Sequence, residues 1–357
     1  MNYSPLSYLA LFSTSAVVVG FLTPRFRSLA LRRRIIDSPN SAHKTHVQPV
    51  PYLGGIAIAI GVVFTALAAT ALTDLSLLGL VIGILIPPVL LSVVGFIDDL
   101  KNLEPLPRFI AQTIVGVAVA LILIQTDSVG TPTGSRSLDI AITILFIVGL
   151  SNSINFFDNI DGGASGTVAI STFFLAFFAY SSGQYYIAAI SIVITGATLG
   201  FLWWNKSPAR IYMGDAGSLF LGSLLASILI RFDSKSLSLP YSLIVILTLV
   251  AVPLLDTATV IISRISRKIS PFQGGRDHLS HRLIRAGISK VHSVFILWLL
   301  TVIFSTFSAF IFLYIEDHFF ELSCIVVVSW LVALAIFLFL PATDYDKGYE
   351  NHSRKQH

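Results

Sequence analysis

The chain has 357 residues and a formal net charge of +4; 55% of its residues are hydrophobic and only 12% are charged. A soluble domain carries about 25% charged residues, so this composition excludes an ordinary soluble protein and indicates an integral membrane protein. Since no stretch reads as a folded soluble domain, the positive charge does not predict a nucleic-acid partner.

Apolar stretches of about 20 residues, enough for one helix to cross a bilayer, occur eleven times. The first is expected to be a retained helix and not a cleaved signal, because it lacks a basic leader and a convincing cleavage site. Cys324 lies in the last stretch, where a small buried side chain is expected. The stretches lie near 6–22, 53–72, 77–96, 109–125, 138–154, 163–180, 185–204, 214–231, 240–263, 292–315 and 320–341.

The predicted fold class is therefore all-α: a polytopic membrane protein with a single transmembrane domain over 1–341 and a polar cytoplasmic tail over 342–357. The basic residues predict its orientation. Of the 23 lysine and arginine residues, 20 fall in one of the two sets of loops. Loops rich in lysine and arginine face the cytoplasm, so we expect the N-terminus outside and the C-terminus inside, in a plasma or inner membrane.

Two adjacent carboxylates, Asp98 and Asp99, end the third apolar stretch. They repel each other, and the negative end of a helix dipole disfavours them further. A cation would relieve both effects, and Mg²⁺ typically takes one or two carboxylates together with substrate phosphate oxygens. Lys101, Asn102 and Arg108 follow in the same loop, which suits a metal-bound diphosphate, although such a pair alone can be merely solvated.

Polar side chains also crowd the stretch between the fifth and sixth helices. On a helical repeat, Asn152, Asn155 and Asn159 would share one face, with Asp158 and Asp161 on an adjoining face. These groups could hold ribose, base or sugar hydroxyls, or they could satisfy one another between helices. Five such groups within ten residues favour a substrate site.

The eighth stretch opens with Gly214-Asp215-Ala216-Gly217-Ser218. Asp215 would lie in the first helical turn, where free N–H groups stabilise its charge or a bound phosphate. Capping alone explains an aspartate there. It does not explain two glycines, which weaken a helix unless something must approach closely.

Basic side chains and histidines occupy the first and the last of the cytoplasmic loops. In the first, we expect Arg32 to Arg34 to contact anionic lipid, and Lys44 and His46 to contact phosphate. The last loop can form a basic helix that binds zinc through its histidines, rests on lipid headgroups, or binds an anion. Arginines beside the histidines favour the anion; the residues concerned are Arg276, His278, His281 and Arg282.

Together, these loops resemble the polyprenyl-phosphate N-acetylhexosamine-1-phosphate transferases. The resemblance implies transfer of a sugar-1-phosphate from a UDP-sugar to a membrane polyprenyl phosphate such as undecaprenyl phosphate. UMP would be released, in the first membrane step of cell-envelope glycan synthesis. The resemblance extends approximately over residues 37–287 and rests on five motifs that occur in the family's order. They are Asp37-Ser-Pro-Asn with Lys44-x-His46 and Gly54-Gly55, Asp98-Asp99 with Arg108, Asn152-x-x-Asn155 with Asp158 and Asp161, Met213-Gly-Asp215, and Arg276-Asp-His278-x-x-His281-Arg282.

The resemblance also implies Mg²⁺ as cofactor, with Mn²⁺ as a substitute. Asp215 would bind it, with Asp98 and Asp99 at the reacting phosphates, and a homodimer is one assembly that the sequence leaves open. Direct attack by the lipid phosphate is favoured over an aspartyl-phosphate intermediate, since a phosphate monoester is largely dianionic at pH 7. The expected substrate contacts are Lys44, His46, Asn102, Arg108, Asn152, Asn155, Asp158, Asp161, Arg276, His278, His281 and Arg282.

Three residues depart from the family pattern: His43 replaces an arginine, Arg108 a lysine, and Ser280 a histidine. The muramoyl-pentapeptide branch typically carries three consecutive histidines, so the N-acetylhexosamine branch is favoured. A phospho-muramoyl-pentapeptide transferase is the first alternative. A secondary transporter is the second; it would place ionisable groups near the middle of the membrane, where only Asp256 is expected.

Overall fold

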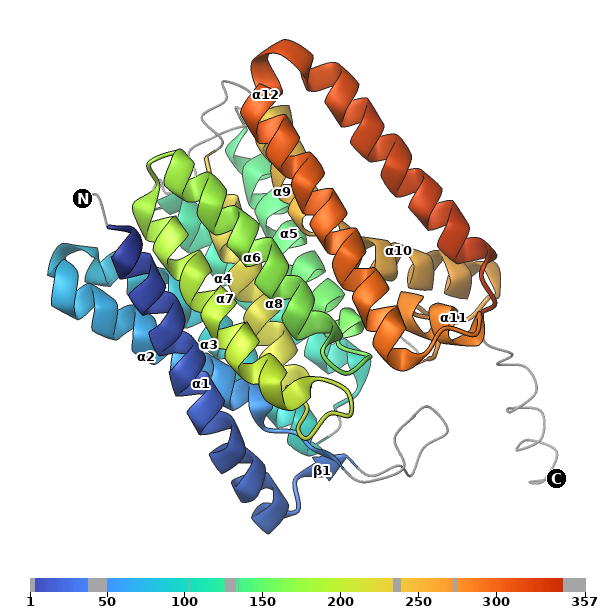
Figure 1. The fold of residues 1–357 in the computed structure, drawn as a ribbon, viewed down its shortest axis with the longest axis horizontal. Helices are drawn as coiled ribbons and strands as arrows, with labels where there is room; N and C mark the ends of the chain where they lie inside the picture. The colour runs from blue at the N-terminus through green and yellow to red at the C-terminus, as the bar shows by residue number, and fades with distance from the viewer. Residues whose placement is uncertain are drawn as a thin grey trace.

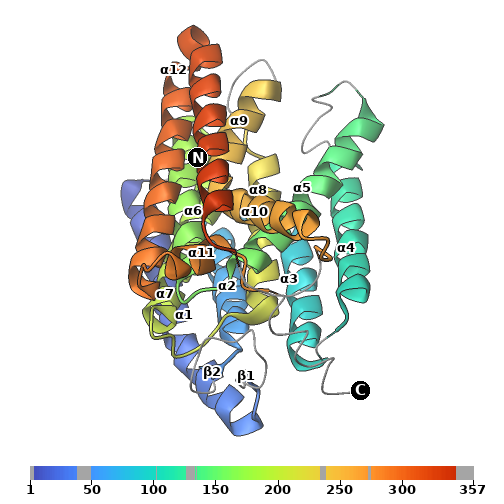
Figure 2. The ribbon, with the colours of Figure 1, turned by 90° about the vertical axis from the view of Figure 1, so that its right-hand side faces the viewer.

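A computed structural model describes residues 4–37, 50–101, 103–125, 133, 135–233, 239–271 and 275–342. Helices dominate this part of the chain, and most of them run side by side as a bundle (Figures 1 and 2). The expected all-α polytopic architecture is confirmed. The helices are α1 (Pro5–Arg33), α2 (Gly54–Thr73), η1 (Leu75–Leu77), α3 (Leu78–Lys101), α4 (Pro105–Gln125), α5 (Arg136–Phe157), α6 (Gly163–Ser181), α7 (Tyr185–Asn205), α8 (Gly214–Ile230), α9 (Leu239–Leu249), α10 (Ala251–Ser266), α11 (Leu279–Arg285) and α12 (Lys290–Phe339).

Each of the eleven predicted stretches contains helix, but they differ in kind. Within the described residues, eight helices are long and apolar enough to cross a membrane, or nine if one bent pair counts as a span. The predicted stretches near 109–125 and 214–231 correspond to the shorter apolar helices Leu106–Ile122 and Gly214–Ile230. The last two predicted spans are the two arms of α12, which folds back on itself at Tyr314 and His318 (Figure 1).

The predicted continuous helix over 240–263 is wrong, because the chain bends by 78° between α9 and α10. Pro253 explains the bend: it has no N–H for the carbonyl of Leu249 and its ring clashes with that carbonyl. The hydroxyl of Ser171 donates to this carbonyl instead, at 2.7 Å. Figure 2 shows the result, with α10 running across the bundle.

Helix α8 is the centre of the bundle, with buried residues along its whole length, and it packs against α2, α3 and α5. Glycines allow the closest of these contacts. A Cβ atom at Gly95 of α3 would lie 2.3 Å from the carbonyl oxygen of Asp215, and one at Gly55 of α2 would lie 2.2 Å from the nitrogen of Gly217. The ends of α2 and α3 are therefore pressed against the first turn of α8.

Two short strands, β1 (Ile36–Asp37) and β2 (Val50–Pro51), pair antiparallel at the same end of the bundle. The first-loop residues between them, including Lys44 and His46, lie outside the described residues, as do Asn102 and the tail beyond residue 342. Cys324 differs from expectation: it is exposed on the second arm of α12 and not buried.

Candidate active site

Four helices bring polar side chains together where α3 meets the start of α8; we call Asp98, Asp99, Arg108, Asn155 and Asp215 the acidic cluster. Arg108 of α4 donates from Nη1 to Asp98 Oδ2 at 2.7 Å and to Asp215 Oδ2 at 2.9 Å. Asn155 of α5 donates from Nδ2 to Asp215 Oδ1 at 2.7 Å. Three of the five motifs thus meet at one point.

Asp98 and Asp99 have different hydrogen-bond partners in this cluster. Asp98 is buried and accepts from Arg108 and from the backbone N–H of Leu103, at 2.8 Å. Asp99 accepts from the N–H groups of Asp215 and Ala216, at 2.9 and 3.1 Å, so its carboxylate caps α8. The cap requires Gly214, which has φ of +69° and where a Cβ would lie 2.6 Å from Asp99 Oδ2.

We therefore expect unequal effects from the two amide substitutions. Asp99→Asn removes a negative charge from the positive end of α8 and one of the two oxygens that accept its N–H groups, which should reduce the free energy of unfolding by roughly 0.3 to 1 kcal/mol. Asp98→Asn leaves the cap intact and should reduce turnover more than stability. Thermal melting and initial rates of both variants test this division, and indistinguishable behaviour would contradict it.

The spacing of the third motif predicts one helical repeat from Asn152 to Asp161, but the structure does not form one continuous helix there. Helix α5 ends at Phe157, so Asp158, Asn159 and Asp161 lie in the loop before α6. The carboxylate of Asp161 accepts from the backbone N–H of Ala209 at 3.1 Å, which fixes this loop to the segment before α8. Asn152, one turn before Asn155, donates to Gln112 Oε1 of α4 at 2.6 Å and so braces α4 against α5.

Asp158 is partly buried beside the acidic cluster. Burial, followed by the negative charges of Asp215 and Asp161, raises the pKa of its carboxyl to about 7. The unfolded value is about 3.9, so the folded protein holds the Asp158 proton more tightly than the unfolded chain does. Its contribution to the free energy of unfolding is then full below pH 4, decreases as the pH rises to about 7, and levels off above it.

Asp158→Asn should remove this pH dependence. We expect the variant to gain melting temperature over the parent at pH 8 in EDTA, and the gain to shrink towards pH 5. A difference in melting temperature that stays constant over this range would contradict the raised pKa.

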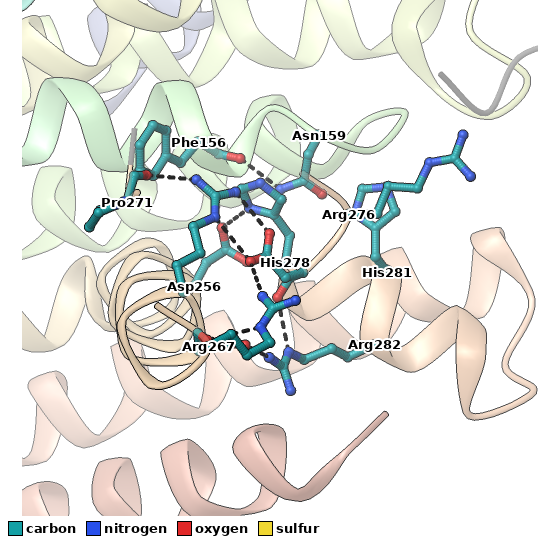
Figure 3. A network of polar contacts seen from close by, with 12 residues as sticks. Phe156, Asn159, Asp256, Arg267, Pro271, Arg276, His278, His281 and Arg282 are labelled. Carbon is teal, nitrogen blue, oxygen red and sulfur yellow. Dashed lines mark hydrogen bonds and ion pairs between the residues drawn. The ribbon is translucent and has the colours of Figure 1, made fainter. Parts of the chain in front are cut away.

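A second group of side chains surrounds His278, at the start of α11 (Figure 3). His278 Nδ1 lies 2.8 Å from Asp256 Oδ2 of α10, and the histidine ring meets the ring of Phe156 edge to face. The hydroxyl of Ser280 donates to Asn159. The contacts of Phe156 and Asn159 join the last loop to the end of α5 and to the loop that follows it, so the histidine motif lies against the third motif.

Among the basic residues of this loop, Arg282 is buried, whereas Arg276 and His281 are half-buried. Arg282 is 1% exposed. It donates to the carbonyls of Asp277, Phe337 and Leu340 and to Ser263 Oγ, so it braces α11 against α10 and α12 and is not brought to the acidic cluster. The side chains of Arg276 and His281 lie to one side of Asp256 (Figure 3), and the ring centroids of His281 and His278 are 5.9 Å apart. Burial and the neighbouring His278 lower the pKa of His281 to about 3, so its imidazole is neutral at pH 7.

The protein family of this chain follows from its similarity to known proteins. Residues 80–233 match the model of glycosyl transferase family 4. A probable undecaprenyl-phosphate N-acetylglucosaminyl 1-phosphate transferase of Bacillus subtilis is 33% identical over 82% of this chain and 82% of its own. The chain belongs to glycosyl transferase family 4. The match covers the third and fourth motifs and Asp98-Asp99 with Arg108.

Two further proteins are similar to the chain over most of its length. A decaprenyl-phosphate N-acetylglucosaminephosphotransferase of Mycolicibacterium smegmatis is 33% identical over 83% of this chain and 80% of its own. A phospho-N-acetylmuramoyl-pentapeptide-transferase of Geobacillus thermodenitrificans is 28% identical over 84% of this chain and 95% of its own. This chain is therefore a membrane transferase, with higher identity to the N-acetylglucosamine phosphotransferases.

Sequence reasoning missed three residues of this family-4 site. Gln112 contacts Asn152, Tyr52 donates its hydroxyl to the carbonyl of Asp99 at 2.9 Å, and Asp256 contacts His278. Gln112 could have been found, since it follows Arg108 by four residues on one helical face. Asp256 could also have been found, because an acid inside an apolar stretch is a functional candidate in its own right.

The donor set of the acidic cluster can be tested against a magnesium ion. In the described part of the chain, no group of three or more His, Cys, Asp or Glu side chains is arranged to hold a metal ion. Asp98 and Asp215 nevertheless lie close enough to share one nitrogen of Arg108. Two carboxylates are what Mg²⁺ usually takes from a protein when substrate phosphates complete its shell, so these residues fit the ion.

Proposed function

We propose that this protein transfers N-acetylhexosamine-1-phosphate from a UDP-sugar to a polyprenyl phosphate, with release of UMP. The observation that carries the proposal is the junction of the acidic cluster with the histidine loop, through Asn155, Phe156 and Asn159 of one segment. This junction offers cationic, amide and carboxylate groups to two phosphorylated substrates. The names of the relatives supply the substrate class.

The reaction joins two anions, so positioning and charge neutralisation must supply most of the catalysis. An oxygen of the lipid phosphate attacks the β-phosphorus of the UDP-sugar, the bond from that phosphorus to the bridging oxygen breaks, and UMP leaves. Arg108 places positive charge between Asp98 and Asp215, and Asn155 holds the other oxygen of Asp215. The lipid phosphate is already dianionic at pH 7, so a general base contributes little.

Mg²⁺, or Mn²⁺ in its place, is proposed as the cofactor. Asp215 and Asp98 would hold it, with Asp99 fixing the backbone of Asp215, and the ion would neutralise charge on the reacting phosphates. Both oxygens of Asp99 accept N–H groups of α8, which makes it the least available of the three acids.

We also propose that this site faces the cytoplasm of a plasma or inner membrane, as the basic loops predict. In a Cys324→Ser background, cysteines at Lys101 and Lys206 should react with an impermeant thiol reagent only from the cytoplasmic face. Cysteine at Thr73, the far end of α2, should react only from the outside. The reverse pattern would contradict the orientation.

A panel of radiolabelled donors distinguishes the proposed function from its alternatives. Purified protein receives polyprenyl phosphate, Mg²⁺ and either UDP-N-acetylhexosamine or UDP-muramoyl-pentapeptide, and the lipid extract is counted. We expect label from the first donor and not from the second. Label from the pentapeptide donor alone would identify the muramoyl branch, and donor uptake into vesicles without lipid label would indicate a transporter.

A further inference from the structure

Asp256 is a fully buried carboxylate whose two oxygens are both engaged by the histidine loop. Oδ2 lies 2.8 Å from His278 Nδ1, and Oδ1 accepts the backbone N–H of Leu279 at 2.7 Å. The residue is 0% exposed and sits on α10 just past the bend. One side chain of α10 therefore fixes both the ring of His278, as Figure 3 shows, and the backbone N–H of the first residue of α11.

The chemistry of these contacts determines where the imidazole carries its proton. A carboxylate only accepts hydrogen bonds. Oδ1 of Asp256 already accepts the Leu279 N–H, and Oδ2 is the oxygen that faces Nδ1. Nδ1 of His278 must then be the donor. The neutral ring consequently presents Nε2 as an acceptor, while a protonated ring presents Nε2 as a donor stabilised by the charge of Asp256.

Among the described residues, Asp256 is the carboxylate that Nδ1 of His278 meets. Asp277, the residue before His278, is paired with Arg264 through two bonds of 2.8 and 3.0 Å and with Arg267 at 2.8 Å. Phe156 and His281 contact the ring by their edges or faces, with centroids 6.2 and 5.9 Å away. Asp277 thus anchors the loop, and Asp256 is left to orient the imidazole.

We propose that Asp256 is a positioning residue for the transferase reaction, which fixes the tautomer and direction of His278 so that Nε2 serves the substrates. This inference rests on the proposed function, since His278 has its role only in that reaction. Asp256 itself touches no reacting atom. Its effect on catalysis should therefore pass entirely through His278.

Asp256→Asn tests the proposal because it changes polarity without changing shape. The Leu279 N–H cannot become an acceptor, so the amide oxygen should stay with it. The amide N–H₂ then faces Nδ1, which must give up its proton and leave Nε2 protonated in the neutral ring. We expect kcat/KM to fall by roughly 10- to 100-fold, by analogy with the loss when the hydrogen-bond partner of a metal-binding histidine is removed.

The matched control is Asp139→Asn. Asp139 is another buried aspartate, 4% exposed, that accepts a backbone N–H through one oxygen, but it lies in the first turn of α5 at the opposite end of the bundle. We expect this variant to keep parental activity. If the parent protein itself transfers no phosphosugar, the proposed function fails; if the parent and Asp256→Asn are equally active, only the present inference fails.

A double-mutant cycle separates positioning from general structural support. In a His278→Gln background, Asp256→Asn should reduce kcat/KM by no more than about a further twofold, because the histidine that Asp256 orients is no longer present. Losses that multiply instead would show that Asp256 acts independently of His278 and would overturn the proposal. Melting temperatures of all four proteins, in lipid nanodiscs, accompany the rates.

A measurement on the parent chain covers the case in which Asp256→Asn does not fold. Nitrogen-15 NMR of histidine-labelled protein, with the His278 signals assigned by their loss in His278→Gln, reports which ring nitrogen carries the proton. We expect a protonated Nδ1 at every pH and an unprotonated Nε2 at high pH. A neutral ring with its proton on Nε2 would overturn the proposal.

Discussion

Asp215→Asn should reduce phosphosugar transfer by roughly 10²- to 10³-fold, the loss typical of removing one preorganised charge from an active site. Arg108 and Asn155 each donate to one oxygen of the Asp215 carboxylate, so this side chain is the point that three helices share. The amide has the same shape but half the acceptor capacity and no charge. Its single oxygen could accept from Arg108 or from Asn155 but not from both, and any cation bound at the cluster would be held more weakly.

The start of α8 should survive this substitution, because its first N–H groups are capped by Asp99. We therefore expect the melting temperature of Asp215→Asn to stay near that of the parent when rates are measured at saturating Mg²⁺. Turnover of the variant equal to that of the parent would contradict a role for Asp215 in the active site. Undiminished activity of the parent protein in excess EDTA would contradict the metal requirement.

Arg108 provides the second large effect, and the structure predicts which replacement is tolerated. A single nitrogen, Nη1, makes both contacts to Asp98 and Asp215. A lysine ammonium can take that one position, so Arg108→Lys should keep activity within about tenfold. Arg108→Ala leaves two carboxylates facing each other and should lose roughly 10²-fold or more.

Transfer rates and melting temperatures of the two Arg108 variants check this expectation. Equal losses in Arg108→Lys and Arg108→Ala would mean that the planar guanidinium, and not one positive charge, is required. Arg108→Gln serves as a further comparison, since it keeps a hydrogen-bond donor without the charge and should resemble the alanine variant.

Much of the fold followed from the sequence because its signals are local. Hydropathy located helices in all eleven stretches, and adjacent acids at a helix end marked the place where α3 meets α8. The break at Val250 was missed, because residues on both sides of it are apolar and a hydropathy window detects no bend. Without that break, Asp256 was placed near the middle of a membrane span, far from the histidine loop that it holds.

The sequence predicted which residues form the candidate site better than it predicted how they are arranged. Asp98, Arg108, Asn155 and Asp215 meet as the motifs suggested. The capping role of Asp99 depends on the crossing of α3 and α8 at Gly95, which is a tertiary contact. Arg282 looked like an anion ligand by composition, but its guanidinium is buried among the carbonyls of Asp277 and α12, and no local pattern reports such burial.

One measurement tests the central claim most directly. UDP-N-acetylglucosamine carrying phosphorus-32 in its β-phosphate and tritium in its sugar is incubated with the purified protein, polyprenyl phosphate and Mg²⁺, and the lipid extract is counted for both labels. The proposed reaction predicts that the two labels enter the lipid in equal molar amounts while unlabelled UMP is released. Tritium without phosphorus-32 in the lipid, or no lipid label at all, would contradict it.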